Sequence, residues 1–189
     1  DAVPITFGQE GSGWRASLEN AKAMIQLAAT TLYTSSLGAT AVGTGSTCPL
    51  KKGYAKYACA ALNKVLKTTK YKVTNNLFQS TWSKDQFVFV SGAVKALAVN
   101  MYKISQDVRF LASGPRSGFG EINIPQNEPG SSIMPGKVNP TQCELMSMAS
   151  DQVFGHDLNI ALCAAQANFE LNTFGTFLMQ NFVQMIGIF

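Results

Sequence analysis

The sequence predicts an all-α fold in which long helices pack as a bundle. Apolar residues recur at alternating spacings of three and four over several long stretches, which is the pattern of a helix with one buried stripe. Only 14% of the residues are charged whereas 46% are hydrophobic. Because roughly 25% charged residues is usual in a soluble domain, we expect much of this surface to be covered by other protein.

The two longest stripes come first in the chain. One occupies residues 14–32, and the other occupies residues 87–111 with spacings that alternate between three and four throughout. At ~1.5 Å per residue the second helix would be about 40 Å long. Ser83 and Gln86 form a capping-box pattern near its start, and Gly114-Pro115 is expected to end it.

Three further helices complete the predicted bundle. A shorter helix is expected around residues 52–67, and two more stripes run through residues 146–163 and 174–189. Narrow stripes on long helices are typical of helical bundles. Apolar residues also lie off the second stripe, at Val88, Phe89 and Val99. They need a second packing surface, so we expect the helices to assemble with other copies of the chain.

The length of the chain, 189 residues, is enough for one domain with a real core, so residues 1–189 are expected to form a single helical domain. The four cysteines lie far apart and are interpreted as reduced packing residues, with no disulfide and no metal site. No apolar run reaches the ~18 uncharged residues of a membrane span. The absence of an initiator Met and the apolar last residues suggest a fragment of a longer, cytoplasmic or mitochondrial-matrix protein.

The first half of the chain is basic. No acidic residue occurs between Glu19 and Asp85, while that span holds nine lysines. Clustered positive charge can indicate nucleic-acid binding. The span nevertheless lacks arginine and any known binding motif, so a solvated face that attracts small anions is the favoured interpretation, without nucleic acid as a partner.

The residues from Gly130 to Asn139-Pro140, here called the signature loop, read Gly-Ser-Ser-Ile-Met-Pro-Gly-Lys-Val-Asn-Pro. The two glycines allow close backbone approach and a sharp turn, and Lys137 supplies a positive charge. Asn139 is a preferred helix cap and Pro140 fits a first helical position, so a helix N-terminus is expected to face the loop. Hydroxyls beside fixed positive groups suit removal of a carbon-bound proton next to a carboxylate, although an ordinary connection has the same composition.

Four other features each allow a structural as well as a functional interpretation. The glycine-rich run 38–45 lacks the spacing of a nucleotide-binding loop and is expected to be a turn. Arg116 could bind a carboxylate, but an arginine that ties down its own loop is favoured. His156, the one histidine, lies on an apolar stripe and is expected to be a satisfied buried residue. Glu144 could pair with Lys137 or simply favour its helix start, and both alternatives stay open.

The signature loop and its surroundings resemble the fumarase/aspartase superfamily. The resemblance extends over nearly the whole chain and is closest to the class II, iron-free fumarate hydratases, notably in Lys137-Val-Asn-Pro-Thr-Gln-Cys-Glu144 and Asn168-Phe-Glu-Leu-Asn172. Leu37-Gly-Ala-Thr-Ala41 leans slightly towards aspartases. The segment Leu77–Asp85 departs from the family's usual text. The resemblance implies the central helical domain of that fold.

The resemblance also implies roles for individual residues. Ser131 matches the family's serine base, which removes a proton from Cβ, and Ser132 matches a substrate contact. Glu144 matches a glutamate that supports the site. A third group matches the segment that stabilises the aci-carboxylate intermediate, and its members are Lys137, Val138 and Asn139.

The activity implied is reversible hydration of fumarate to L-malate, with a small dicarboxylate as partner and no metal or organic cofactor. The family resemblance further implies a homotetramer in which each site draws on three subunits. The family's Thr-His pair would precede Asp1, so the isolated chain is expected to be inactive. Aspartate ammonia-lyase, which shares the proton abstraction, and a non-catalytic helical assembly module remain as alternatives.

Overall fold

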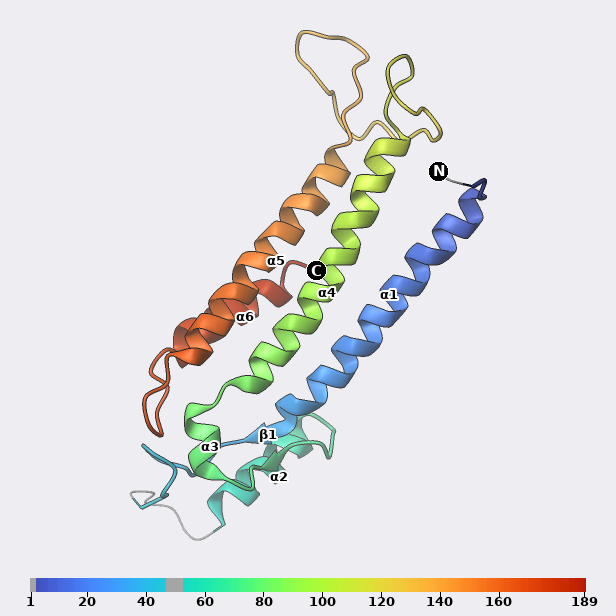
Figure 1. Ribbon diagram of the computed structural model, residues 1–189. Helices are drawn as coiled ribbons and strands as arrows, with labels where there is room; N and C mark the ends of the chain where they lie inside the picture. The colour runs from blue at the N-terminus through green and yellow to red at the C-terminus, as the bar shows by residue number, and fades with distance from the viewer. Residues whose placement is uncertain (1–2, 47–52) are drawn as a thin grey trace. The chain divides into compact units, whose positions relative to one another are not determined.

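The computed structural model describes residues 3–46 and 53–189, and this part of the chain is almost entirely helical (Figure 1). The helices are α1 (Phe7–Ala29), a short 3-10 helix (Thr30–Tyr33), α2 (Tyr54–Val65), α3 (Leu77–Trp82), α4 (Asp85–Leu111), α5 (Thr141–Ala165) and α6 (Gly175–Ile186). Two strands of two residues each, β1 (Thr34–Ser35) and β2 (Lys72–Val73), are the part of the secondary structure that the sequence analysis did not predict. The all-α prediction and the five expected helices are confirmed.

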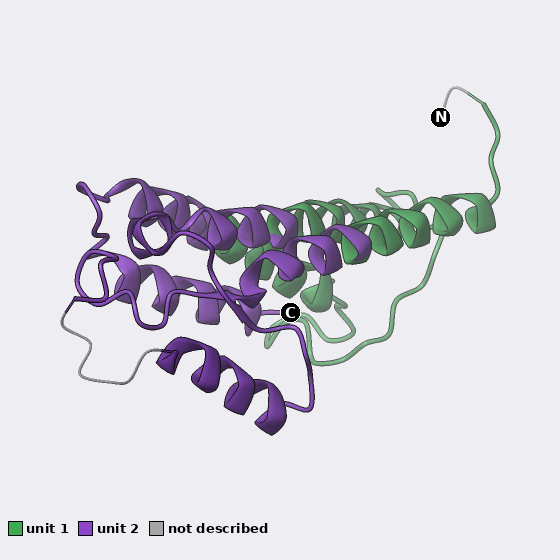
Figure 2. Cartoon of the chain, turned by 90° about the horizontal axis from the view of Figure 1, so that it is seen from below, with its two compact units in different colours: residues 1–22, 95–154 green, residues 23–94, 155–189 purple. Residues whose placement is uncertain are grey.

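The chain divides into two compact units, shown in green and purple in Figure 2. Unit 1 contains residues 1–22 and 95–154, and unit 2 contains residues 23–94 and 155–189. The long helices α1, α4 and α5 each contribute one end to unit 1 and the other end to unit 2. Each unit is therefore built from segments that are distant in sequence.

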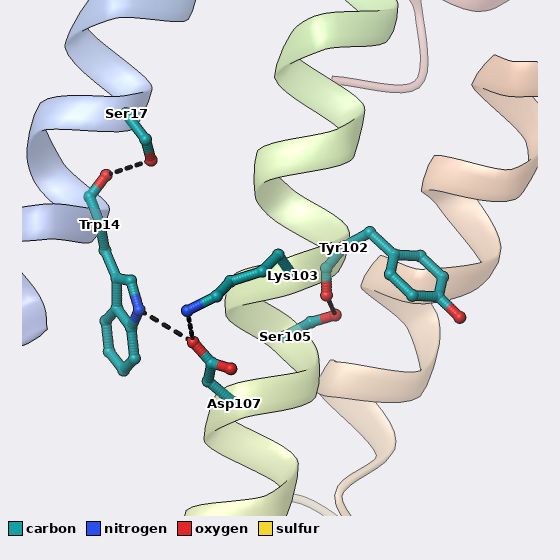
Figure 3. Close-up of polar contacts among 6 residues, drawn as sticks. All are labelled: Trp14, Ser17, Tyr102, Lys103, Ser105 and Asp107. Carbon is teal, nitrogen blue, oxygen red and sulfur yellow. Dashed lines mark hydrogen bonds and ion pairs between the residues drawn. The ribbon is translucent and has the colours of Figure 1, made fainter. Parts of the chain in front are cut away.

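In unit 1, polar side chains join α1 to α4 (Figure 3). The indole Nε1 of Trp14 donates a hydrogen bond of 3.0 Å to Asp107 Oδ2, and the ammonium of Lys103 pairs with the same carboxylate. Asn100 Nδ2 donates to the Ser17 carbonyl at 3.2 Å. These bonds fix how the two helices lie against each other along their length.

A second set of bonds in unit 1 joins the end of α4 to the start of α5. Gln106 Nε2 donates to Ser147 Oγ at 2.8 Å, and the hydroxyls of Ser105 and Ser147 lie 3.2 Å apart. Both helix ends are thereby fixed, and residues 112–140 connect them as two loops beyond those ends (Figure 1, yellow to orange). The signature loop thus extends from a rigid base.

Unit 2 has a core of large, deeply buried apolar residues. Ile160 and Met185 have no exposed surface, and Leu178 is almost fully buried. The rings of Phe87 on α4 and Phe182 on α6 meet edge to face, with centroids 5.1 Å apart. The predicted stripes of α5 and α6 therefore form this core, as their periodicity indicated.

Two buried polar pairs lie in the same unit. Ser91 Oγ donates to Asp157 Oδ1 at 2.7 Å. His156 Nδ1 lies 2.9 Å from Asn181 Oδ1, and the Asn181 amide nitrogen donates to the Phe177 carbonyl. This amide orientation makes Asn181 Oδ1 the acceptor, so His156 Nδ1 carries the proton. His156 is a satisfied buried histidine, as predicted.

The glycine-rich run of unit 2 is a turn, also as predicted. It follows β1, which pairs in parallel with β2. Gly43 has a φ of +101° and sits so close to α3 that a Cβ would lie 2.7 Å from Phe78 Cα. Glycine is required there because both the backbone conformation and the space exclude a side chain.

The start of α4 differs from the predicted capping box. The Lys84 carbonyl accepts from the Phe87 and Val88 amides, so the helix begins at Asp85. Ser83 instead ends α3, where its amide donates to the Gln79 carbonyl. The capping box does not form, because the Gln86 amide donates to Asp85 Oδ1 at 3.0 Å, while Ser83 Oγ accepts from the Asp85 amide at 3.5 Å.

Many large apolar side chains are not covered by the described part of the chain. On α4, Phe89 and Val99 are each about half exposed, as expected for residues off the predicted stripe. Of the helices in the described residues, only α4 is long and apolar enough to cross a membrane by length and composition, a test that core helices of water-soluble proteins also pass. The buried contact of Ser91 with Asp157 and the bond from Asn100 to Ser17 are those of a helix packed against protein.

The contrast between buried and exposed positions on α5 gives a stability prediction. Replacing Ile160 (0% exposed) by alanine removes buried methyl groups and leaves a cavity, which is expected to cost about 2–5 kcal/mol of unfolding free energy. Replacing Leu162, which is 53% exposed, should change it by roughly 0.5 kcal/mol or less. Urea unfolding of the monomeric chain, followed by circular dichroism, checks both. Equal losses for the two variants would contradict this description of the core.

Candidate functional site

The signature loop connects the extended segment after α4 to the first turn of α5, without helix or strand of its own. Its sequence explains the irregular backbone, because Pro135 cannot donate a hydrogen bond and Gly136 adopts a φ of +79°. The Lys137 amide donates to the Met134 carbonyl at 3.3 Å, which closes a tight turn at the tip.

The two ends of the loop are held together at a narrow neck. The Gly130 amide donates to the Lys137 carbonyl at 3.2 Å, and Asn139 Nδ2 donates to the Gly130 carbonyl at 2.7 Å. A Cβ at position 130 would overlap the Lys137 carbonyl. Gly130 is therefore present because the backbones approach too closely for any side chain, which confirms its predicted purpose.

Ser131 lies just inside this neck and is partly buried. Its Oγ accepts a hydrogen bond of 3.2 Å from the Ile133 amide. A serine oxygen that gains negative charge is stabilised by such a donor. The arrangement also limits the rotation of the hydroxyl group, so its orientation is set by the loop backbone.

The other predicted loop residues are exposed. The side chains of Ser132, Lys137 and Val138 all face solvent in the described structure. Glu144 is also exposed, and within the described residues it forms no ion pair with Lys137. The structure therefore excludes the ion pair between Glu144 and Lys137. Glu144 lies in the first turn of α5, where its negative charge stabilises the start of the helix.

The start of α5 lies one residue later than predicted. The Pro140 carbonyl accepts from the Cys143 and Glu144 amides, so Pro140 precedes the first helical residue, Thr141. Asn139 directs its amide group to the loop neck. The cap expected from Asn139-Pro140 was wrong because the tertiary contact with Gly130 uses that side chain. The N-terminal end of α5, with its unpaired amides and partial positive charge, still adjoins the loop.

The pKa of the Cys143 thiol reflects its burial and the charges near the first turn of α5. Burial raises the pKa of the Cys143 thiol, with a smaller contribution in the same direction from Glu144 and an opposing one from Arg109. Burial likewise raises the pKa of the Cys163 thiol. Both cysteines are free, as is Cys59; Cys59 and Cys163 are buried and Cys143 is partly buried. Cys48 lies outside the described residues.

A second closed loop, residues 113–120, lies beyond the end of α4 in the same unit. The Gly120 amide donates to the Ser113 carbonyl at 2.6 Å, and the Phe119 amide donates to Ser113 Oγ at 3.1 Å. Among the described residues the Arg116 side chain makes no hydrogen bond or ion pair, and it is exposed. The expectation that Arg116 ties down its own loop was wrong, because backbone bonds to Ser113 close that loop instead.

The geometry brings together one oriented hydroxyl, one lysine and one helix N-terminus at a single end of unit 1. Within the described ranges no three His, Cys, Asp or Glu side chains cluster in a way that could hold a metal. The Ile133 amide was missed by the sequence analysis, because any residue type supplies a backbone amide and only the folded loop shows which one reaches Ser131.

Comparison with known proteins shows the family to which the chain belongs. The Lyase_1 family model, whose description is lyase, matches residues 1–155. The class II fumarate hydratase of Halalkalibacterium halodurans is 49% identical over 97% of this chain and 39% of that protein. The class II fumarate hydratase of Helicobacter pylori is 47% identical over 98% of this chain and 40% of that protein.

Solved structures show the same fold. The crystal structure of a recombinant class II fumarase from Schistosoma mansoni matches 98% of this chain and 41% of its own, with a TM-score of 0.93 and 33% identity. A fumarate lyase:delta crystallin structure from Brucella melitensis, bound to cobalt, matches all of this chain with a TM-score of 0.92 and 38% identity.

The chain spans about two fifths of the length of the curated relatives it matches. Its family match covers most of the sequence, and the match includes the signature loop and the first part of α5. The chain belongs to the Lyase_1 family of lyases.

Proposed function

We propose that this chain supplies the proton-abstracting part of a class II fumarate hydratase, which interconverts L-malate and fumarate without a metal. The observation that carries the proposal is the closed signature loop, in which the Ile133 amide bonds to Ser131 Oγ beside the start of α5. Identities of 47–49% to proteins named class II fumarate hydratase support the choice of reaction.

Ser131 is the proposed base. In the direction of fumarate formation its oxygen takes the proton from Cβ of malate, and the electron pair left behind spreads into the adjacent carboxylate. A serine is a weak base unless its alkoxide form is stabilised. The Ile133 amide donates to that oxygen and so contributes to this stabilisation.

The charge that develops on the substrate needs fixed positive partners. We assign this role to the exposed ammonium of Lys137 and to the backbone of Val138 and Asn139, at the end of the loop that leads into α5. The partial positive charge at the N-terminus of α5 acts in the same direction. Ser132 is assigned a contact to the substrate carboxylate, and Glu144 is assigned a supporting role.

The remaining groups, including the acid that assists departure of hydroxide, come in this proposal from protein outside the chain. The loop is open to solvent, whereas a reaction of this kind needs a site from which water is largely excluded. The exposed apolar faces of α4 and α5 are the proposed contact surfaces of a homotetramer built through the long helices.

A chimera tests Ser131 directly. This chain replaces the matching 184-residue segment of the Halalkalibacterium halodurans relative, and malate–fumarate interconversion is followed by the ultraviolet absorbance of fumarate. The chimera should be active and the isolated chain inactive. Ser131→Ala should lower kcat by about 100- to 10,000-fold, because loss of a general base has effects of that size.

The matched control is Ser36→Ala, since Ser36 is an exposed serine far from the signature loop in the sequence. Its chimera should keep the parental rate, and both variants should elute from gel filtration like the parent. A Ser131→Ala chimera with near-normal kcat would remove Ser131 from the role of base.

The neck of the loop gives a second prediction for the chimera. Gly130→Ala introduces a methyl group where the Lys137 carbonyl lies, so the neck must open and kcat should fall at least tenfold. Gly136→Ala is the control within the loop, because the added Cβ meets no atom within 4 Å. Its cost is the positive φ of residue 136, which destabilises the loop by about 1–2 kcal/mol. Its kcat should fall less, and the opposite order would contradict the proposed role of the neck.

Aspartate ammonia-lyase is the competing activity, since deamination of aspartate proceeds through the same proton abstraction and also yields fumarate. A polypeptide that contains this chain with its native flanking segments should form fumarate from malate and not from aspartate, as measured by ultraviolet absorbance. Faster formation from aspartate would reassign the reaction, while the role of Ser131 would remain to be judged from the chimera.

A further inference from the structure

A cleft of about 820 Å³ lies within unit 2, whereas the signature loop belongs to unit 1. The end of α3, the starts of α4 and α6 and the segment around β1 line it. The lining includes apolar side chains, among them Phe87 and Met179, and polar ones, among them Ser35, Thr74 and Lys84. Such a cleft suits a small ligand that has one polar and one apolar end.

Lys84 is held in a defined position at the edge of this cleft. Its Nζ donates to the carbonyl of Ser80 at 3.3 Å and to the carbonyl of Thr81 at 3.1 Å. Together with the bond to Cε, these two hydrogen bonds occupy three of the four tetrahedral directions around the nitrogen. In the neutral amine both protons are used by the carbonyls, so the lone pair takes the remaining direction and stays available for reaction.

Burial makes the neutral amine of Lys84 more accessible than that of an exposed lysine. Burial lowers the pKa of the Lys84 ammonium, and the smaller effect of the Asp85 carboxylate raises it. Gly175 lies against the stem of the lysine, since a Cβ there would be 3.7 Å from Lys84 Cε. A cleft-lining lysine with a lowered pKa has more neutral amine at a given pH than an exposed lysine, and the neutral amine is the nucleophile.

We propose that Lys84 is an acyl-acceptor site, at which activated acyl groups such as acyl phosphates and acyl thioesters modify the chain. The Nζ lone pair attacks the carbonyl carbon and forms an amide bond. The carbon–oxygen bond to phosphate or the carbon–sulfur bond to the thiol breaks, the leaving group departs with the bonding electrons, and the nitrogen releases one proton to solvent.

The position of Lys84 gives the modification a consequence for the fold. An acylated nitrogen has a single N–H and no charge, so it can keep one of its two bonds to Ser80 and Thr81 and must lose the other. Those carbonyls end α3, directly before α4 begins at Asp85. Acylation therefore weakens the junction between the two helices, and the apolar side chains that line the cleft offer a place for the acyl tail.

The test labels the native 189-residue chain with acetyl phosphate at neutral pH and quantifies each lysine by peptide mass spectrometry. Lys72, an exposed lysine of the same unit, is the internal reference. Lys84 should be acetylated several-fold faster than Lys72 in chain whose helix content is verified by circular dichroism, and the excess should vanish in urea. Equal rates in the folded chain, or an excess that persists in urea, would overturn the proposal.

Two further comparisons sharpen the result. Asp85→Asn removes the charge that raises the pKa of Lys84, so the labelling rate should increase, while Asp151→Asn at an exposed position of α5 should leave it unchanged. Butyryl-CoA should give a larger ratio of Lys84 to Lys72 labelling than acetyl-CoA, because the apolar side chains that line the cleft can contact the longer tail. An unchanged rate in Asp85→Asn or an unchanged ratio would contradict the assigned environment. None of these readouts depends on hydratase activity.

Discussion

The arrangement of the site depends on the closure of one loop over its own backbone. The Gly130 amide and carbonyl both bond to the far end of the loop, the first to Lys137 and the second to the side chain of Asn139. Without that neck, Ser131 and the start of α5 would have no fixed relation, and the Ile133 amide would not be held at the serine oxygen. Preorganised donors of this kind stabilise developing charge because they need no rearrangement during the reaction.

The neck is effective because its base is rigid. Ser147, on the second turn of α5, bonds to Gln106 and lies beside Ser105 on α4, so both helix ends hold the loop in place. On the same turn of α4, Asp107 Oδ2 accepts a hydrogen bond from the indole of Trp14 on α1. Long helices are suited to this purpose, because polar bonds at one end and apolar packing at the other position a small polar loop with little local freedom.

The helices could be predicted from the sequence, whereas the helix ends and the loops were predicted only in part. The stripe over residues 87–111 matched α4 because helical periodicity is a local property repeated over many turns. Helix ends were less predictable, since Ser83, Asn139 and Arg116 have side chains suited to several partners. In each case a tertiary or neighbouring backbone group decided the outcome: α3 for Ser83, Gly130 for Asn139 and the bonds to Ser113 around Arg116.

The helical fold, the family and the residues of the signature loop could all be inferred before any coordinates, because apolar spacing and an unusual run of eleven residues are local properties of the chain. The tertiary structure alone decided that Asn139 closes the loop, that a backbone amide reaches Ser131 and that Lys84 borders a cleft. The physical reason is that hydrogen bonds and burial depend on which groups meet in space. Residues far apart in sequence, such as Lys84 and Gly175, have no shared pattern until the chain folds.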